Sequence, residues 1–77
     1  MKYTVEAFSC ETEFLEFTLS LPAGCDAQLA EIMGWLTPQR GDEGYNLDAA
    51  QIAALESLAD TRFFDANYSF QLTCNAD

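Results

Sequence analysis

Carboxylates supply most of the chemistry available to this chain. Thirteen Asp and Glu side chains stand against three Lys and Arg, and histidine is absent, so the net charge is −10 over 77 residues. Without an imidazole the chain has no histidine base, no histidine metal ligand and no histidine to activate a cysteine. No glycine-rich phosphate loop or nucleotide-binding fingerprint occurs either. We therefore predict that the protein is not an enzyme and binds no cofactor.

One stretch gathers oxygen donors that could bind calcium, namely Asp42, Glu43, Asn46 and Asp48. Their order does not follow the alternating ligand pattern of an EF-hand loop, which ends in a distant Glu. The sequence therefore predicts no metal site at these residues.

The cysteines are odd in number and lie at Cys10, Cys25 and Cys74. They lack the paired spacing of a zinc site. This usage favours reduced thiols in a bacterial-type cytoplasm. A disulfide between Cys25 and Cys74 remains an alternative if the last strand runs antiparallel to the first.

The negative charge exceeds the magnitude of about 2–8 that small domains usually carry. Such an excess attracts basic partners and repels phosphates and anionic lipid. We therefore predict a basic protein partner, with no direct contact to nucleic acid or membrane. The alternative is an acidic surface that serves only solubility. A signal segment and an apolar run of about 18 residues are both missing, so we predict a cytoplasmic protein.

The elements that position these groups form one predicted domain over residues 1–77, since no linker or repeat divides the sequence. Residues 3–9, 13–21 and 67–74 alternate with the period of strands. A first helix ends at Gly34, and a second begins at Asp48 with Gln51 completing a capping box. These elements predict an α+β fold in the order β-β-α-α-β. Three antiparallel strands, with the first in the middle, would carry both helices on one face.

A three-residue hairpin loop from Cys10 to Thr12 would fix the register of the first two strands. That register pairs Ala7 with Leu15 and Val5 with Phe17 on the face toward the helices. A slip by one residue would turn the apolar side chains to the wrong face, which supports the pairing.

On the opposite face the same register pairs Glu6 with Glu16 and Phe8 with Phe14. Like charges that face each other across a sheet destabilise it by up to about 1 kcal/mol. A local conflict of this kind indicates a functional surface. We predict that these four residues contact the partner, with the carboxylates steering it and the rings losing water on contact. In the alternative, the C-terminal tail or the 36–46 loop covers the two rings.

A second candidate surface follows Trp35, which is itself expected to fill a gap in the core. Asp42, Glu43 and Tyr45 lie in a glycine-flanked loop that could reach a basic cleft, or could form an ordinary solvated turn. Further along the chain, one ring of the Phe63–Phe64 pair is expected in the core and the other at the surface.

Three segments are similar to an uncharacterised family of small, acidic bacterial domains that would span the whole chain: Lys2–Phe8, Leu29–Trp35 and Tyr68–Asn75. In size and charge, the chain also resembles the immunity proteins that bacteria make against their own secreted toxins. Immunity proteins of nuclease toxins present acids to the basic groove where the toxin holds its nucleic acid. This resemblance implies an acidic inhibitor that is monomeric when free and binds a basic toxin domain 1:1.

Two other functions stay open. The first is a phage-encoded mimic of nucleic acid, such as an anti-restriction or anti-CRISPR protein, although the carboxylates here are scattered along the chain. The second is a small regulatory or adaptor protein, including a homodimer formed through Phe8 and Phe14.

Overall fold

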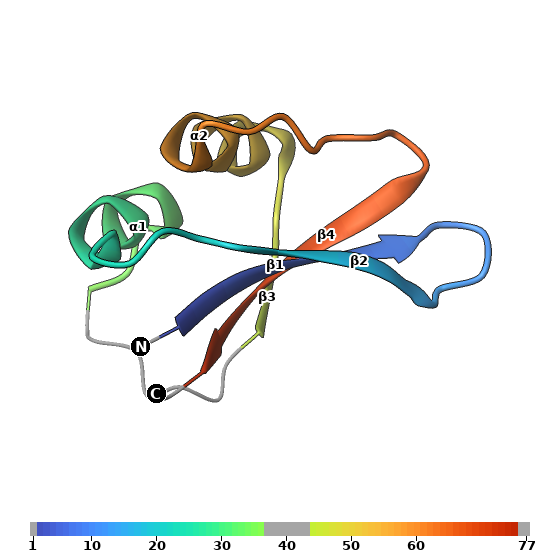
Figure 1. Ribbon diagram of the computed structural model, residues 1–77, viewed down its shortest axis with the longest axis horizontal. Coiled ribbons are helices and arrows are strands. Elements are labelled where there is room, and N and C mark those ends of the chain that lie inside the picture. Colours follow the sequence, from blue (N-terminus) through green and yellow to red (C-terminus); the bar gives the residue numbers. More distant parts are fainter. Residues whose placement is uncertain (1, 37–43, 76–77) are drawn as a thin grey trace.

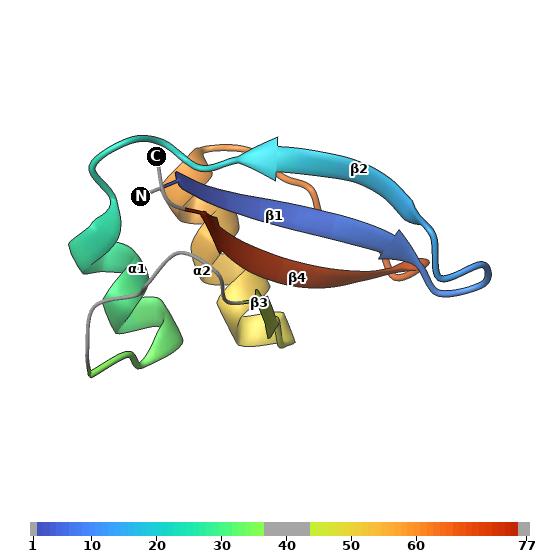
Figure 2. The same cartoon turned by 90° about the horizontal axis from the view of Figure 1, so that it is seen from below.

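The chain forms a four-stranded antiparallel sheet with two helices on one face, as the computed structural model in Figure 1 shows. The structure describes residues 2–36 and 44–75. Figure 2 views the sheet from the side opposite the helices, which lie behind it. The elements in chain order are β1 (Lys2–Ser9), β2 (Leu15–Ser20), α1 (Asp26–Met33), β3 (Gly44–Asn46), α2 (Ala49–Ala59) and β4 (Tyr68–Asn75).

The predicted α+β class and the two helices are confirmed, and the strand number is corrected. The strand order is β2-β1-β4-β3, so β1 lies between its hairpin partner and the last long strand, as predicted. The prediction of three strands is wrong because β3 pairs antiparallel with β4, with Tyr45 opposite Leu72. A strand of three residues is too short for its alternation to stand out from a glycine-flanked loop.

The predicted register of β1 and β2 is wrong by two residues. Ala7 pairs with Phe17, and Val5 pairs with Leu19. One residue of the shift comes from the hairpin loop, because Ser9 donates its N–H to the Phe14 carbonyl at 2.9 Å and the loop therefore includes position 13. The second comes from a β-bulge between Ala7 and Phe8. Because the two shifts add to an even number, Phe17 and Leu19 still face the helices as predicted. The prediction is wrong for Leu15, which comes before the bulge and pairs with Phe8 on the opposite face.

The end of α1 and the start of α2 are capped by the residues predicted from the sequence. Gly34 ends α1 in the left-handed conformation at φ 72°. At the start of α2, the Asp48 carboxylate accepts the Gln51 N–H at 2.8 Å, and the Gln51 side chain accepts the Asp48 N–H at 3.0 Å. This capping box contributes about 1 kcal/mol to stability. Within residues 2–36 and 44–75, no helix is long and apolar enough to cross a membrane.

The core lies between the sheet and the helices. Its largest fully buried side chains come from both layers: Leu29, Leu55, Leu72, Val5 and Cys74. Cys25 is also buried, and no disulfide joins it to Cys74. Cys10 is exposed in the hairpin loop.

Candidate functional site

The predicted glutamate pair is separated in the structure. Glu6 pairs with Thr18 on β2 and with Gln71 on β4. Glu16 is the extra residue of the bulge and borders a shallow hollow with Tyr68. Since Tyr68 contacts buried Phe70, this hollow lies on the helix side of the sheet. The two carboxylates therefore do not oppose each other, and the conflict between like charges is absent at this pair.

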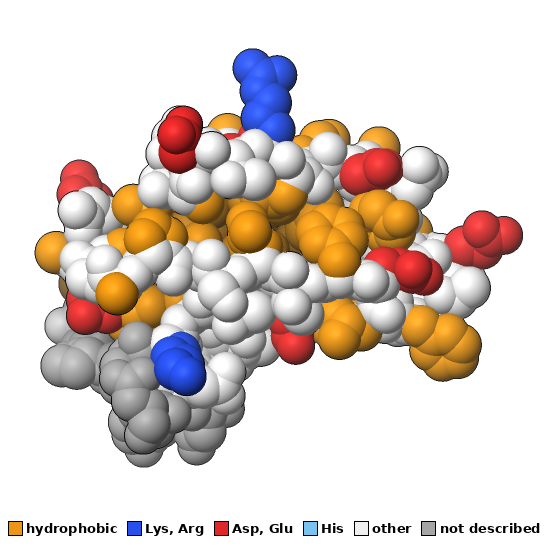
Figure 3. Space-filling model, viewed as in Figure 1, with side chains coloured by type: hydrophobic (Ala, Val, Ile, Leu, Met, Phe, Trp, Pro, Cys, Tyr) orange, Lys and Arg blue, Asp and Glu red, His pale blue; other side chains and the backbone are white. Residues whose placement is uncertain are grey.

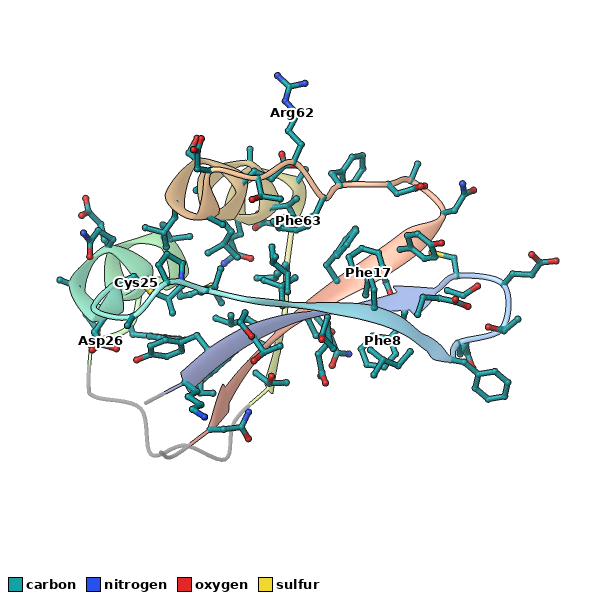
Figure 4. The ribbon with its side chains drawn as sticks, viewed as in Figure 1. Phe8, Phe17, Cys25, Asp26, Arg62 and Phe63 are labelled. Atoms are coloured by element: carbon teal, nitrogen blue, oxygen red, sulfur yellow. The ribbon has the colours of Figure 1, made fainter. Side chains whose placement is uncertain are left out.

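The two phenylalanines of the predicted surface do not pair with each other, and Phe8 is half-buried whereas Phe14 is exposed. Phe8 pairs with Leu15 and points away from the helices, as Figure 4 shows. Phe14 is 74% exposed, and Leu15 is 49% exposed. The alternative in which the chain covers both rings is therefore wrong for Phe14. An apolar end of the hairpin remains available for contact.

The second predicted surface is only partly described. Asp42 and Glu43 lie outside the described residues. Tyr45 is half-buried, and its ring centroid is 5.3 Å from that of Trp35. Trp35 also contacts Tyr3 at 6.2 Å and packs against the core, as predicted. Tyr45 therefore takes part in packing as well as bordering the surface.

A larger apolar surface, which the sequence reasoning missed, lies along β2. Figure 3 shows hydrophobic side chains gathered in a band between the helices and this strand. We define the β2 strip as Phe17, Leu19, Phe63 and Phe64. Phe17 is 36% exposed and Phe64 is 56% exposed, whereas Leu19 and Phe63 are half-buried. Phe63 and Phe64 thus divide between core and surface as predicted.

The strip is held in place by one buried ring. Phe70 on β4 is 3% exposed. The ring centroids of Phe17, Phe63 and Phe64 lie 6.3, 5.5 and 6.1 Å from that of Phe70. Aromatic pairs at such distances contribute about 0.5–1.5 kcal/mol beyond their buried area. The strip is therefore a preformed surface, and a partner would not have to order these rings on binding.

Glu56 positions the end of the strip that follows α2. Its carboxylate oxygen Oε2 accepts the N–H of Phe63 at 2.7 Å and the N–H of Phe64 at 3.0 Å. The amides of Phe64 and Phe63 hold the pKa of Glu56 below its ordinary value, because they stabilise the charged form. This single carboxylate therefore fixes the backbone that presents the most exposed ring of the strip.

Replacing Glu56 with glutamine is expected to speed amide hydrogen exchange at Phe63 and Phe64, because the charged acceptor is lost. The same loosening is expected in the unmodified protein at acid pH. Because the folded pKa is lowered, the stabilisation is complete above the ordinary glutamate value of about 4.3 and is lost as the pH falls through the lower folded value. Protection factors measured by NMR, which correct for the pH dependence of intrinsic exchange, check both effects.

Glu31→Gln is the matched control for this measurement, since Glu31 is exposed on α1. It should leave exchange at Phe63 and Phe64 unchanged. Equal exchange in the Glu56 and Glu31 variants would mean that the Glu56 carboxylate does not hold this segment.

Exposed carboxylates lie in the two segments that border the β2 strip. Glu11, Glu13 and Glu16 are exposed in or next to the hairpin loop. Asp60 and Asp65 are exposed in the segment between α2 and β4. Arg62 lies in that same segment and projects away from the sheet (Figure 4). The arrangement can therefore attract cationic groups toward the aromatic surface.

The groups around Cys25 are not suited to nucleophilic chemistry. Burial raises the pKa of the Cys25 thiol, and the neighbouring Asp26 carboxylate raises it further. Burial and a hydrogen bond to Asp26 also raise the pKa of Tyr3. A thiol that stays protonated is a poor nucleophile. In the part of the chain that is described, no three His, Cys, Asp or Glu side chains are grouped to hold a metal ion.

The sequence profile of the family described as "Domain of unknown function (DUF7683)" matches residues 2–73. The chain belongs to this family. The match covers nearly the whole sequence, in agreement with the predicted likeness to a family of small domains. A comparison with curated proteins finds no match. On the surface of this DUF7683 domain, the β2 strip with its flanking carboxylates is the candidate site.

Proposed function

We propose that this protein binds and neutralises a basic protein, as an immunity protein does for a basic toxin domain. The observation that supports this proposal is an exposed aromatic surface on a chain of net charge −10. The contact would centre on the β2 strip, with Glu13 and Glu16 at its border, and would continue around the hairpin end of the sheet to Phe14 and Leu15. Large apolar anchors surrounded by charges of one sign are typical of a binding surface for an oppositely charged protein.

The two kinds of group would act at different stages of binding. The carboxylates act at long range and raise the rate of encounter, which can approach about 10⁸–10⁹ M⁻¹s⁻¹ at low salt. The rings act after contact, when burial of about 25 cal/mol per Å² of apolar surface slows dissociation. Fast capture matters for an inhibitor that must reach a toxin before the toxin acts. The free protein would be monomeric, because copies of this charge repel one another.

Co-expression in a bacterial host tests this proposal. The gene is expressed together with whichever adjacent reading frame encodes a basic domain, and each is also expressed alone. We expect the basic product to arrest growth alone, growth to resume when both are present, and a 1:1 complex to be purified. If growth stays arrested and the two proteins separate on size exclusion, they are not an immunity pair and the proposal fails.

A further inference from the structure

Among the strands that the structure describes, β2 ends the order β2-β1-β4-β3, so none of them pairs with the outer side of its backbone. Leu21 donates its N–H to the Tyr3 carbonyl at 2.9 Å. Leu21 and Tyr3 therefore form a hydrogen-bonded pair, and the backbone polar groups of Leu21 point toward β1. Bonded and non-bonded pairs alternate in an antiparallel ladder. The N–H and C=O groups of Thr18 and Ser20 therefore point outward. Within residues 2–36 and 44–75, no hydrogen bond to these outward groups is found.

The features that usually protect an edge strand occur only at the two ends of β2. The bulge and the charge of Glu16 lie at one end, and Pro22 follows the other. Residues 17–20 between them have no charge, no proline and no bulge. An edge of this kind is a template for pairing with a further strand.

We propose that β2 accepts an extended, basic segment of the partner as a fifth strand of the sheet. The proposal rests on the proposed function and deepens it by naming the structure that the partner presents. The added strand would bond with the outward groups of Thr18 and Ser20. Its alternate side chains would cover Phe17 and Leu19, which β2 presents toward the strip.

The charge of the chain favours a basic partner segment over a second copy of this chain as the strand that pairs with β2. Pairing two β2 edges would bring together two chains that each carry a net charge of −10. Each of these chains also has the exposed Glu13 and Glu16 next to its β2 edge. A segment that alternates apolar residues with Lys or Arg instead meets these carboxylates with opposite charge.

The probe is a nine-residue peptide of alternating lysine and valine, titrated at low salt into the ¹⁵N-labelled protein. We expect the amides of Thr18 and Ser20 to shift and to exchange more slowly with solvent. The glutamate–valine peptide of the same length should leave both amides unchanged. Because this measurement uses the unmodified chain, it does not depend on the folding of any variant.

Thr18→Pro removes an outward N–H at an edge position, where the fold tolerates proline. Its matched control is Thr18→Val, which keeps the N–H and suits a strand. We expect the proline variant to bind the lysine peptide at least about tenfold more weakly than the control, because a backbone hydrogen bond is lost and the ring blocks approach. Circular dichroism checks that both variants fold.

Three results would overturn the inference. The first is equal binding of the lysine peptide by the two variants. This result would exclude pairing at the β2 edge but would remain compatible with charge-driven binding of a basic protein. The second is the absence of any effect of the peptide on Thr18 and Ser20 in the unmodified protein. The third is a dimer of the free protein in sedimentation that Thr18→Pro abolishes, which would assign the edge to a second copy. Failure of the function itself would appear separately, in the co-expression assay.

Discussion

Replacing Leu72 with alanine is expected to lower the free energy of unfolding by about 2–5 kcal/mol. The side chain is completely buried in the middle of β4, where its residue pairs with Val5 on one side and Tyr45 on the other. A domain of this length has only about 3–5 kcal/mol of stability from a single core. The remaining stability of this variant should therefore be close to zero, so that a large fraction of the molecules is unfolded at room temperature. Urea denaturation followed by circular dichroism measures the loss.

Leu36→Ala removes the same atoms from a side chain that is 99% exposed. This control should change the free energy of unfolding by no more than about 0.5 kcal/mol. If both variants lose the same stability, the core does not lie between the sheet and the helices as described.

Reversing the charges of Glu13 and Glu16 together is expected to slow association with the basic partner by about 10- to 10³-fold at low salt. Each Glu→Lys change adds two units of charge, so the net charge changes from −10 to −6. Both side chains are exposed, and they border the proposed contact. Stopped-flow measurement of the association rate at two ionic strengths checks the effect, which should shrink as salt rises.

The single variants Glu16→Lys and Glu31→Lys form the matched pair, because both residues are exposed and both changes give the same net charge. Glu31 lies on α1, away from the hairpin. The association rate should fall more for Glu16→Lys. Equal rates would show that total charge matters but that its position does not, and the proposed contact would then be wrong.

Much of the fold can be predicted from the sequence because local chemistry determines it. The Asp48–Gln51 capping box and Gly34 mark helix ends through interactions within a few residues. Alternation identifies the three long strands, but the middle position of β1 does not follow from the apolar pattern, because other strand orders would bury the same faces. What the pattern does not specify is register, because the residue added in the hairpin loop and the residue added in the bulge leave the alternation of Phe17 and Leu19 intact.

The candidate site could be predicted less well for the same reason. Glu6 and Glu16 appeared opposed only in a register that the hairpin does not adopt. The β2 strip was missed because Phe17 and Leu19 have the pattern of a buried strand face. Their exposure depends on tertiary structure: β2 is an edge strand, and none of the described strands lies on its outer side. The adjacent phenylalanines Phe63 and Phe64 gave the one usable signal, since both rings could not be buried from consecutive positions.

The contacts of Phe70 imply that partner binding and the stability of the fold are coupled. This ring lies beneath side chains from β2 and from the segment after α2, so the groups a partner would touch are also groups that hold the layers together. A ligand that binds only this folded arrangement adds its binding energy to the stability of the domain, by about 2.7 kcal/mol at a hundred times its dissociation constant. A small domain with a modest core would then gain much of its resistance to heat and proteolysis from being occupied.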